Sequence, residues 1–134
     1  MEIERDVSKA VLRIGIGLIF LYFGFAQAIS PDSWAAYVPS FLSGGIISAN
    51  NLVILNSIFE LTLGLFLIFG IYTRISSLLL AVHLFFISLS IGFNPIGVRD
   101  FGLSVATLVI FLNGPDRFCL DNKKSMRRKA TNLP

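Results

Sequence analysis

Glu60 is the residue whose position most clearly indicates chemistry, because it is an acidic side chain inside a long apolar run. A charged residue in a membrane-spanning helix costs about 2.5–3.5 kcal/mol on insertion scales, so it usually faces a cavity or a partner. Asn56 and Gly64 stand four residues to either side of Glu60 and therefore share its helix face. This spacing predicts a polar stripe on one helix face, and the internal carboxylate of Glu60 is suited to accepting or relaying a proton.

Other polar residues in or beside the apolar runs are further candidates. Arg99 is the natural counter-ion of Glu60 or of Asp100, and it is suited to holding an anion or steering a ring oxygen. Histidine side chains titrate near neutral pH, so His83 is suited to extending a proton relay. A single cysteine rules out a cysteine-rich zinc site, and the single histidine further limits metal sites. We predict Glu60, Arg99 and His83 as catalytic residues and Gln27, Asn56, Asp100 and Ser104 as substrate-binding residues.

Each of these residues also has a purely structural interpretation. An internal Glu–Arg pair often only orders a helix bundle, and a lone glutamate hydrogen-bonded to Asn or Ser can be protonated and inert. For His83 taken alone, a structural histidine in the core is the leading interpretation. Cys119 is expected to be a free, inert thiol. The residue types leave the functional and structural interpretations open.

The composition indicates which kind of protein must position these residues. The chain has 134 residues, of which 54% are hydrophobic and 14% charged, and its mean hydropathy is +0.77. Soluble domains are about 25% charged, so this chain has too few polar groups to cover a soluble surface. The composition therefore argues against a soluble enzyme, a disordered chain and a free nucleic-acid binder, and it predicts an integral membrane protein.

Four apolar stretches are long enough, or nearly long enough, to cross a bilayer, which takes about 20 residues in a helix. Their continuous apolar character argues against the alternating strands of a β-barrel. We predict an all-α, integral membrane bundle of four transmembrane helices in a single domain over residues 1–134. The helices are expected at about 10–29, 52–72, 75–93 and 98–113, followed by a basic cytoplasmic tail at 114–134.

The start of the fourth helix is left open by the sequence. In one reading Asn94 caps the helix and Pro95 takes its first position. In the other reading Asp100 is the cap and residues 94–99 form a loop. Two further stripes are predicted, and the glycines among them permit close helix approach. They are Arg13, Gly17, Phe20, Gly24 and Gln27 in the first helix and Asp100, Ser104 and Thr107 in the fourth.

The Lys and Arg residues predict the orientation of the bundle. Three lie in the N-terminal flank, one is Arg74 between the second and third helices, six lie in the tail, and only Arg99 lies on the other side. By the positive-inside rule, we expect a multi-pass protein of the plasma membrane with both termini in the cytoplasm. The basic tail is expected to touch anionic lipid rather than nucleic acid, and a solvated tail without a partner is an equal alternative.

The expected depths of the polar residues place a pocket in the outer half of the membrane. At about 1.5 Å per residue, Glu60 and His83 differ in depth by about 6 Å, so one or two waters would link them and direct contact is not implied. The loop from Ser30 to Asn51 carries Trp34 and Tyr37, which favour the headgroup level. We expect this loop to lie along the outer interface or to cap the bundle, with docking onto another subunit as the alternative.

Three groups of residues occur in a fixed order along the chain. They are Arg13 with 17–20 and Gly24, then Glu60 with Gly64, Gly70 and 72–74, then Arg99-Asp100 followed by the sequence GPDRFCLD at 114–121. Together they resemble the DoxX/DoxD-like family of small four-helix membrane proteins, over about residues 10–121. The last stretch is similar to the family's Gly-Pro-Gly-Arg-x-Ser-Leu-Asp ending.

The resemblance implies a membrane redox setting, because the best-known members of the family resemble a subunit of thiosulfate:quinone oxidoreductase associated with terminal quinol oxidases. It implies a small subunit of a larger membrane protein complex, a quinone-linked oxidoreductase or an oxygenase or oxidase, in which a quinone is the cofactor to expect. Phe23 and Gln27 stand where family members often carry a histidine and a lysine. This departure keeps a non-catalytic accessory subunit open as the alternative, and a small transporter is a second one.

Overall fold

The computed structural model describes residues 1–122, and these residues form helices and no strands. Four helices are long and apolar enough to cross a membrane, which confirms the predicted all-α membrane bundle of four spanning helices. Two short helices lie between the first and second spanning helices. In chain order the helices are α1 (Glu2–Ile29), α2 (Pro31–Ala35), α3 (Ser40–Ser43), α4 (Ala49–Phe69), α5 (Thr73–Ile91) and α6 (Pro95–Asn113).

Helix α1 begins at Glu2, eight residues before the expected start near Ala10. The apolar run marks only the part of a helix that lies in lipid, whereas the backbone hydrogen bonds continue through the charged residues before it. Glu2 and Glu4 lie in the first turn, where acidic side chains interact favourably with the helix dipole. The predicted start was therefore wrong, although the predicted end of the helix was correct.

The boundaries of α4 and α5 each lie two or three residues before the expected ones. Ser48 caps α4 by accepting a hydrogen bond from the backbone nitrogen of Asn51 at 3.3 Å. Gly70 ends α4 in the left-handed conformation, with φ of 67°, and Tyr72 is left-handed as well, so the chain reverses there and α5 starts at Thr73. Apolar residues continue through this turn, which is why hydropathy alone misplaced it.

Asn94 caps α6, which decides between the two predicted starts of this helix. Its side-chain oxygen accepts hydrogen bonds from the backbone nitrogens of Ile96 at 2.9 Å and Gly97 at 3.0 Å. Pro95 takes the first helical position, where its missing N–H costs nothing. Asp100 is consequently not a cap and lies inside the helix, buried.

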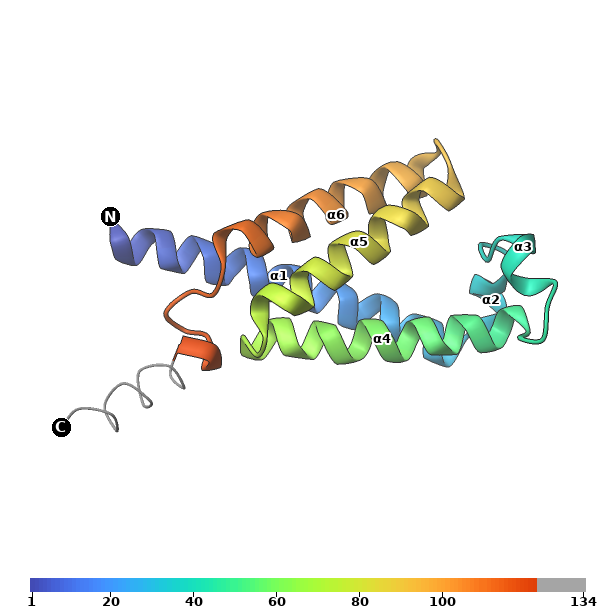
Figure 1. Cartoon of the computed structure of the whole chain (residues 1–134), viewed down its shortest axis with the longest axis horizontal. Helices are drawn as coiled ribbons and strands as arrows, with labels where there is room; N and C mark the ends of the chain where they lie inside the picture. Colours follow the sequence, from blue (N-terminus) through green and yellow to red (C-terminus); the bar gives the residue numbers. More distant parts are fainter. Residues whose placement is uncertain (123–134) are drawn as a thin grey trace.

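The spanning helices pack as two pairs, α1 along α4 and α5 along α6 (Figure 1). Gly17 and Gly64 let α1 and α4 approach closely, since a Cβ atom built on Gly17 would lie 3.0 Å from the carbonyl oxygen of Gly64. All five residues of the predicted α1 stripe are buried. The two pairs lie close at the turn between α4 and α5 and diverge toward the end that carries α2 and α3, which we call the α2–α3 end (Figure 1).

Residues 114–122, the C-terminal segment and the first part of the predicted basic tail, fold back on the bundle. The carboxylate of Asp116 forms an ion pair with Arg13, whose Nε lies 2.8 Å from Oδ2, and Arg13 also donates to the carbonyl oxygens of Leu67 and Ile68. Asp121 accepts hydrogen bonds from the backbone nitrogens of Tyr72 at 2.9 Å and Thr73 at 2.8 Å, so it caps α5. The basic residues of the predicted tail after this segment lie outside the described residues.

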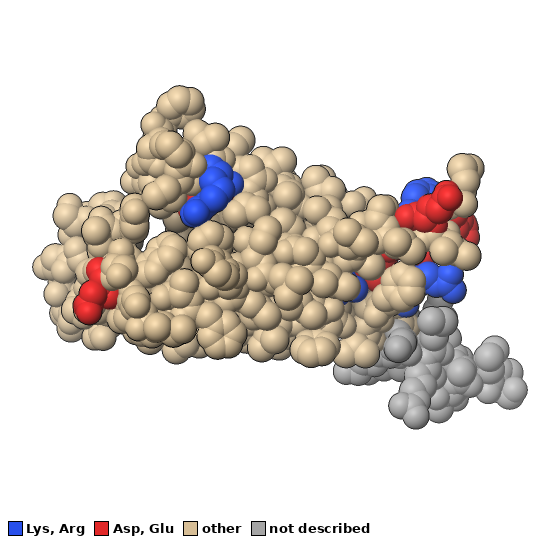
Figure 2. All heavy atoms as spheres, turned by 180° about the vertical axis from the view of Figure 1, so that it is seen from behind, with Lys and Arg blue, Asp and Glu red and all other residues tan. Residues whose placement is uncertain are grey.

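On the face shown in Figure 2, the charged side chains lie toward the two ends of the molecule, and the surface between them is uncharged. The apolar side chains of the four helices are largely exposed in the isolated chain. Such a surface suits a lipid bilayer as its surroundings.

Candidate functional site

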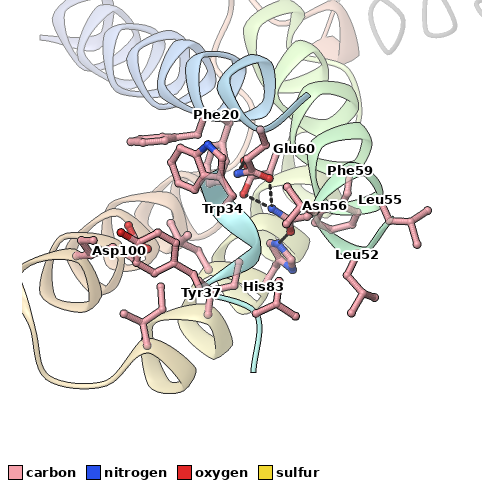
Figure 3. A pocket seen from close by; sticks show the side chains of 18 of the residues that line it. Phe20, Trp34, Tyr37, Leu52, Leu55, Asn56, Phe59, Glu60, His83 and Asp100 are labelled. Atoms are coloured by element: carbon pink, nitrogen blue, oxygen red, sulfur yellow. Dashed lines mark hydrogen bonds between the residues drawn. The ribbon is translucent and has the colours of Figure 1, made fainter. Parts of the chain in front are cut away.

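A cavity of about 420 Å³ lies between the two helix pairs at the α2–α3 end. Its walls come from α1, α4, α5 and α6, and the loop that contains α2 closes its end (Figure 3). Most lining side chains are aliphatic or aromatic, including Phe20, Phe59 and Leu103. Mostly apolar cavities with a few convergent polar groups are typical of sites for small organic ligands.

A hydrogen-bonded cluster of Gln27, Asn56 and Glu60, the polar wall, lines one side of this cavity. Glu60 is 3% exposed and accepts hydrogen bonds at both carboxylate oxygens. The side-chain nitrogen of Gln27 lies 3.0 Å from Oε2, and that of Asn56 lies 3.0 Å from Oε1. Asn56 also donates to the amide oxygen of Gln27 at 2.7 Å. Buried carboxylates usually have such hydrogen-bond partners. Asn56 and Glu60 share one face of α4 because they are four residues apart.

His83 adjoins the polar wall from α5. Its Nε2 atom lies within hydrogen-bond distance of the side-chain oxygen of Asn56, and its ring packs against Phe59 with centroids 4.7 Å apart. The link between Glu60 and His83 therefore runs through the Asn56 side chain, in the place where the depth estimate expected one or two waters. An amide carries no titratable proton near neutral pH, so it joins the two groups without serving as an ordinary proton carrier.

Arg99 and Asp100 lie on the other side of the cavity, on α6. The guanidinium of Arg99 lies 2.8 Å from Oδ1 of Asp100 and 4.6 Å from the ring centroid of Phe23. The sequence allowed two acidic partners for Arg99, and the structure pairs it with Asp100 and not with Glu60. Asp100 is buried whereas Arg99 is 42% exposed, so the pair forms a polar rim between α1 and α6.

Ser104 is the one predicted site residue that the structure places away from the cavity. It is buried between α5 and α6, where its hydroxyl donates to the carbonyl oxygen of Ala81 at 2.8 Å. Ser104 therefore does not line the cavity, because sharing a helix face with Asp100 did not specify how far the cavity extends along that face. The other six predicted residues all line the cavity: Gln27, Asn56, Glu60, His83, Arg99 and Asp100.

The loop after α1 caps the bundle, which is one of the arrangements expected for it. Trp34 packs edge-on against Phe23, with ring centroids 5.9 Å apart, and Tyr37 follows beside it. Asn50 of α4 donates a hydrogen bond to Asp32, which holds α2 in place. Trp34 and Tyr37 line the cavity but were not predicted as site residues, since aromatic residues in such a loop are also typical of a membrane interface.

No three His, Cys, Asp or Glu side chains within residues 1–122 are grouped closely enough to hold a metal ion. The groups that converge on the cavity are two amides, two carboxyls, an imidazole and a guanidinium. They can donate and accept hydrogen bonds and exchange protons with a bound organic molecule.

Comparison with known proteins identifies the family. The family model described as DoxX matches residues 8–92, which include most of α1 and all of α2 to α5. The match covers more than half of the chain, so the chain belongs to the DoxX family. No curated protein and no solved structure gives a significant match.

Proposed function

We propose that this DoxX-family membrane protein binds a quinone in its cavity and acts as a small subunit of a membrane redox complex. The observation that carries the proposal is the polar wall of Gln27, Asn56 and Glu60 on a cavity that is otherwise mostly apolar. A quinone has the matching chemistry, because its flat ring is apolar and its two oxygens accept or donate hydrogen bonds.

The cavity fits a quinone ring in size and in its hydrogen-bonding groups. Ligand cavities of about 300–1,000 Å³ are usual for small organic molecules, and this one has about 420 Å³. Gln27 uses one of its two amide hydrogens on Glu60, so the second can be donated to a ring oxygen. Phe20, Phe59 and Trp34 supply the aromatic faces against which a ring packs.

Glu60 serves as the proton acceptor in this proposal. Oxidation of a quinol releases two protons and two electrons, and a carboxylate beside a ring hydroxyl takes one of the protons. His83, on the neighbouring helix, lines the cavity and takes the other at Nδ1, because its Nε2 already donates to the side-chain oxygen of Asn56. The two electrons leave one at a time, to a haem or an iron–sulfur centre in the partner protein that is re-oxidised between the two transfers.

The charges of the cavity favour an uncharged ring over a small sulfur anion. Arg99 is the only Lys or Arg among the lining residues, and its charge is compensated by Asp100. Glu60 adds a second carboxyl group. An anion would therefore meet no uncompensated positive charge, and desolvating it would be costly.

The orientation that follows from the basic residues belongs to the same proposal. Ten of the eleven Lys and Arg residues lie toward the chain termini or, as Arg74, in the first turn of α5, and Arg99 alone lies toward the α2–α3 end. Both termini are then cytoplasmic, and the cavity opens toward the outer side of the plasma membrane. The residues after 122, which carry five of the basic side chains, contact anionic lipid headgroups.

A non-catalytic accessory subunit is the second candidate, and Gln27 favours it. This neutral amide stands where similar proteins often carry a lysine, and its hydrogen bonds to Asn56 and Glu60 complete a closed cluster. Such a cluster can order the bundle without taking part in a reaction.

The Glu60→Gln variant in native membranes separates the two candidates. It keeps the shape of the side chain and removes its ability to take a proton. We expect quinol-dependent turnover to fall about a hundredfold, as for loss of a general base, while the complex still co-purifies in full amount. Glu4→Gln, at an exposed position in α1, is the matched control and should leave turnover unchanged. Full turnover of an intact Glu60→Gln complex would support the accessory role instead.

A further inference from the structure

We propose, resting on the quinone-binding function above, that the ligand carries a long apolar tail. The tail leaves the cavity between α4 and α5, through a lateral opening bordered by Leu52, Leu55, Ile87 and Ile91.

The opening lies one helical turn beyond the contacts that join α4 to α5. Asn56 and Phe59 of α4 meet His83 of α5 and form the floor of the cavity at this side. From there the two helices diverge toward the α2–α3 end (Figure 1). Leu52 and Leu55 continue the α4 face beyond this floor, at the spacing that places residues on one side of a helix.

The four bordering side chains face both the cavity and the surface. All four line the cavity, yet none of them is buried, and Leu55 is 56% exposed. In Figure 3, Leu52 and Leu55 lie at the edge of the cavity farthest from Asp100. Their outer neighbours on the same helices, Ile58 and Phe86, are exposed apolar residues as well. The border is thus continuous with the apolar surface that faces lipid.

The other sides of the cavity suit a tail less well. The loop with Trp34 and Tyr37 covers the α2–α3 end (Figure 3). Between α1 and α6, Arg99 lies over the ring of Phe23, so that side carries a charge. An acyl or isoprenoid chain loses no hydrogen bonds on entering lipid. If the chain passed between α1 and α6, it would remove water from the charged side chain of Arg99, which is costly. The apolar gap between α4 and α5 is therefore the route for the tail.

The chain contains a single tryptophan, Trp34, which lines the cavity and serves as the reporter for a test. The full-length protein in lipid nanodiscs is titrated with a benzoquinone that carries a ten-carbon tail and with the same ring without a tail. Quenching of Trp34 fluorescence reports binding of either ring. We expect the tailed compound to bind at least about tenfold more tightly, because part of its tail packs against the apolar border.

The double variant Leu55→Phe/Ile87→Phe narrows the opening without adding a charge or a tryptophan. We expect it to lose most of the tail-dependent gain, measured as the ratio of its affinities for the tailed and the tail-free ring. The matched control is Leu65→Phe/Leu89→Phe, which adds the same bulk at exposed positions of α4 and α5 away from the cavity, and it should keep the gain. Thermal unfolding of each variant checks that it is folded.

The outcomes distinguish this inference from the function on which it rests. Equal affinities for the two compounds, or a tail-dependent gain that survives in the Leu55→Phe/Ile87→Phe variant as it does in the control, would overturn the lateral opening and leave ring binding intact. Absence of quenching by either ring would instead contradict quinone binding in this cavity, and the lateral opening with it.

Discussion

Asn56 binds the carboxylate of Glu60, with its amide nitrogen 3.0 Å from Oε1. The same side chain donates to Gln27 and contacts His83, so it joins α1, α4 and α5 at one point. Replacing it removes partners from several buried groups at once. The positions of Gln27, Glu60 and His83 around the cavity thus depend on one uncharged side chain.

The Asn56→Leu variant is expected to be less stable by about 1–3 kcal/mol, because a buried polar group left without its partner retains its desolvation cost. We also expect weaker binding of the tail-free benzoquinone, since Glu60 and Gln27 lose their fixed positions. Thermal unfolding and Trp34 quenching measure the two effects. Asn51→Leu, at an exposed position of the same helix, is the control and should change neither quantity.

The ion pair between Arg13 and Asp116 is predicted to hold the C-terminal segment on the bundle. The two side chains are 2% and 1% exposed. The Asp116→Asn variant leaves a buried guanidinium without its counter-ion, so we expect a loss of about 3–5 kcal/mol of unfolding free energy. The double variant Arg13→Met/Asp116→Leu should recover much of this loss, because it removes both charges. A double variant no more stable than Asp116→Asn would contradict the ion-pair explanation.

The stability of the protein is predicted to fall in acid through Asp116. Burial alone would raise the pKa of this carboxyl, but the hydrogen bonds and the charge of Arg13 outweigh burial and hold the pKa below its ordinary value of 3.8. A carboxyl with a lowered pKa in the folded state stabilises it above the ordinary value, and this contribution is lost as the pH falls through the lower, folded value.

Unfolding midpoints measured from about pH 6 down to about pH 3 test this dependence. Below the ordinary pKa, the midpoint of the unchanged protein should fall more steeply than that of Asp116→Asn, which has no carboxyl to protonate at this position. Parallel curves for the two proteins would show that Asp116 does not cause the acid dependence.

Cys119 is predicted to react slowly with alkylating reagents while the protein is folded. Its side chain is fully buried beside Thr73, and this burial raises the pKa of the thiol, so little thiolate is present near neutral pH. Iodoacetamide should label it only after unfolding in detergent, as followed by mass spectrometry. A cysteine placed at the exposed Ser8, in a chain with Cys119→Ser, should be labelled at once. Rapid labelling of Cys119 in the folded protein would show that the C-terminal segment detaches.

The spanning helices were predictable because each corresponds to a continuous segment of apolar residues in the sequence. A run of about 20 apolar residues specifies a helix in a bilayer whatever its neighbours are. The spacing of Asn56 and Glu60 likewise specified a shared face. The cap at Asn94 was recognisable but not decided, since Asn94 and Asp100 both precede apolar residues and only the backbone geometry shows which one caps the helix.

The tertiary contacts were not predictable from such local patterns. Arg13 and Asp116 are separated by 103 positions, and nothing near either residue indicates the other as its partner. Depth along a helix axis could be estimated for Glu60 and His83, but their lateral arrangement, and hence the bridge through Asn56, depends on how the helices pack. The part of Trp34 in closing the cavity depends on the same packing.

Photoaffinity labelling tests quinone binding in the cavity most directly. The purified full-length protein in nanodiscs is irradiated with a quinone that carries a photoreactive group on its ring, with and without an excess of the unmodified quinone. We predict that mass spectrometry finds the label on cavity-lining residues of the α2 loop and α4, such as Tyr37 and Asn56, and that the excess quinone prevents it. Label confined to lipid-facing residues such as Ile58 and Phe86, unaffected by the excess, would contradict the proposed function.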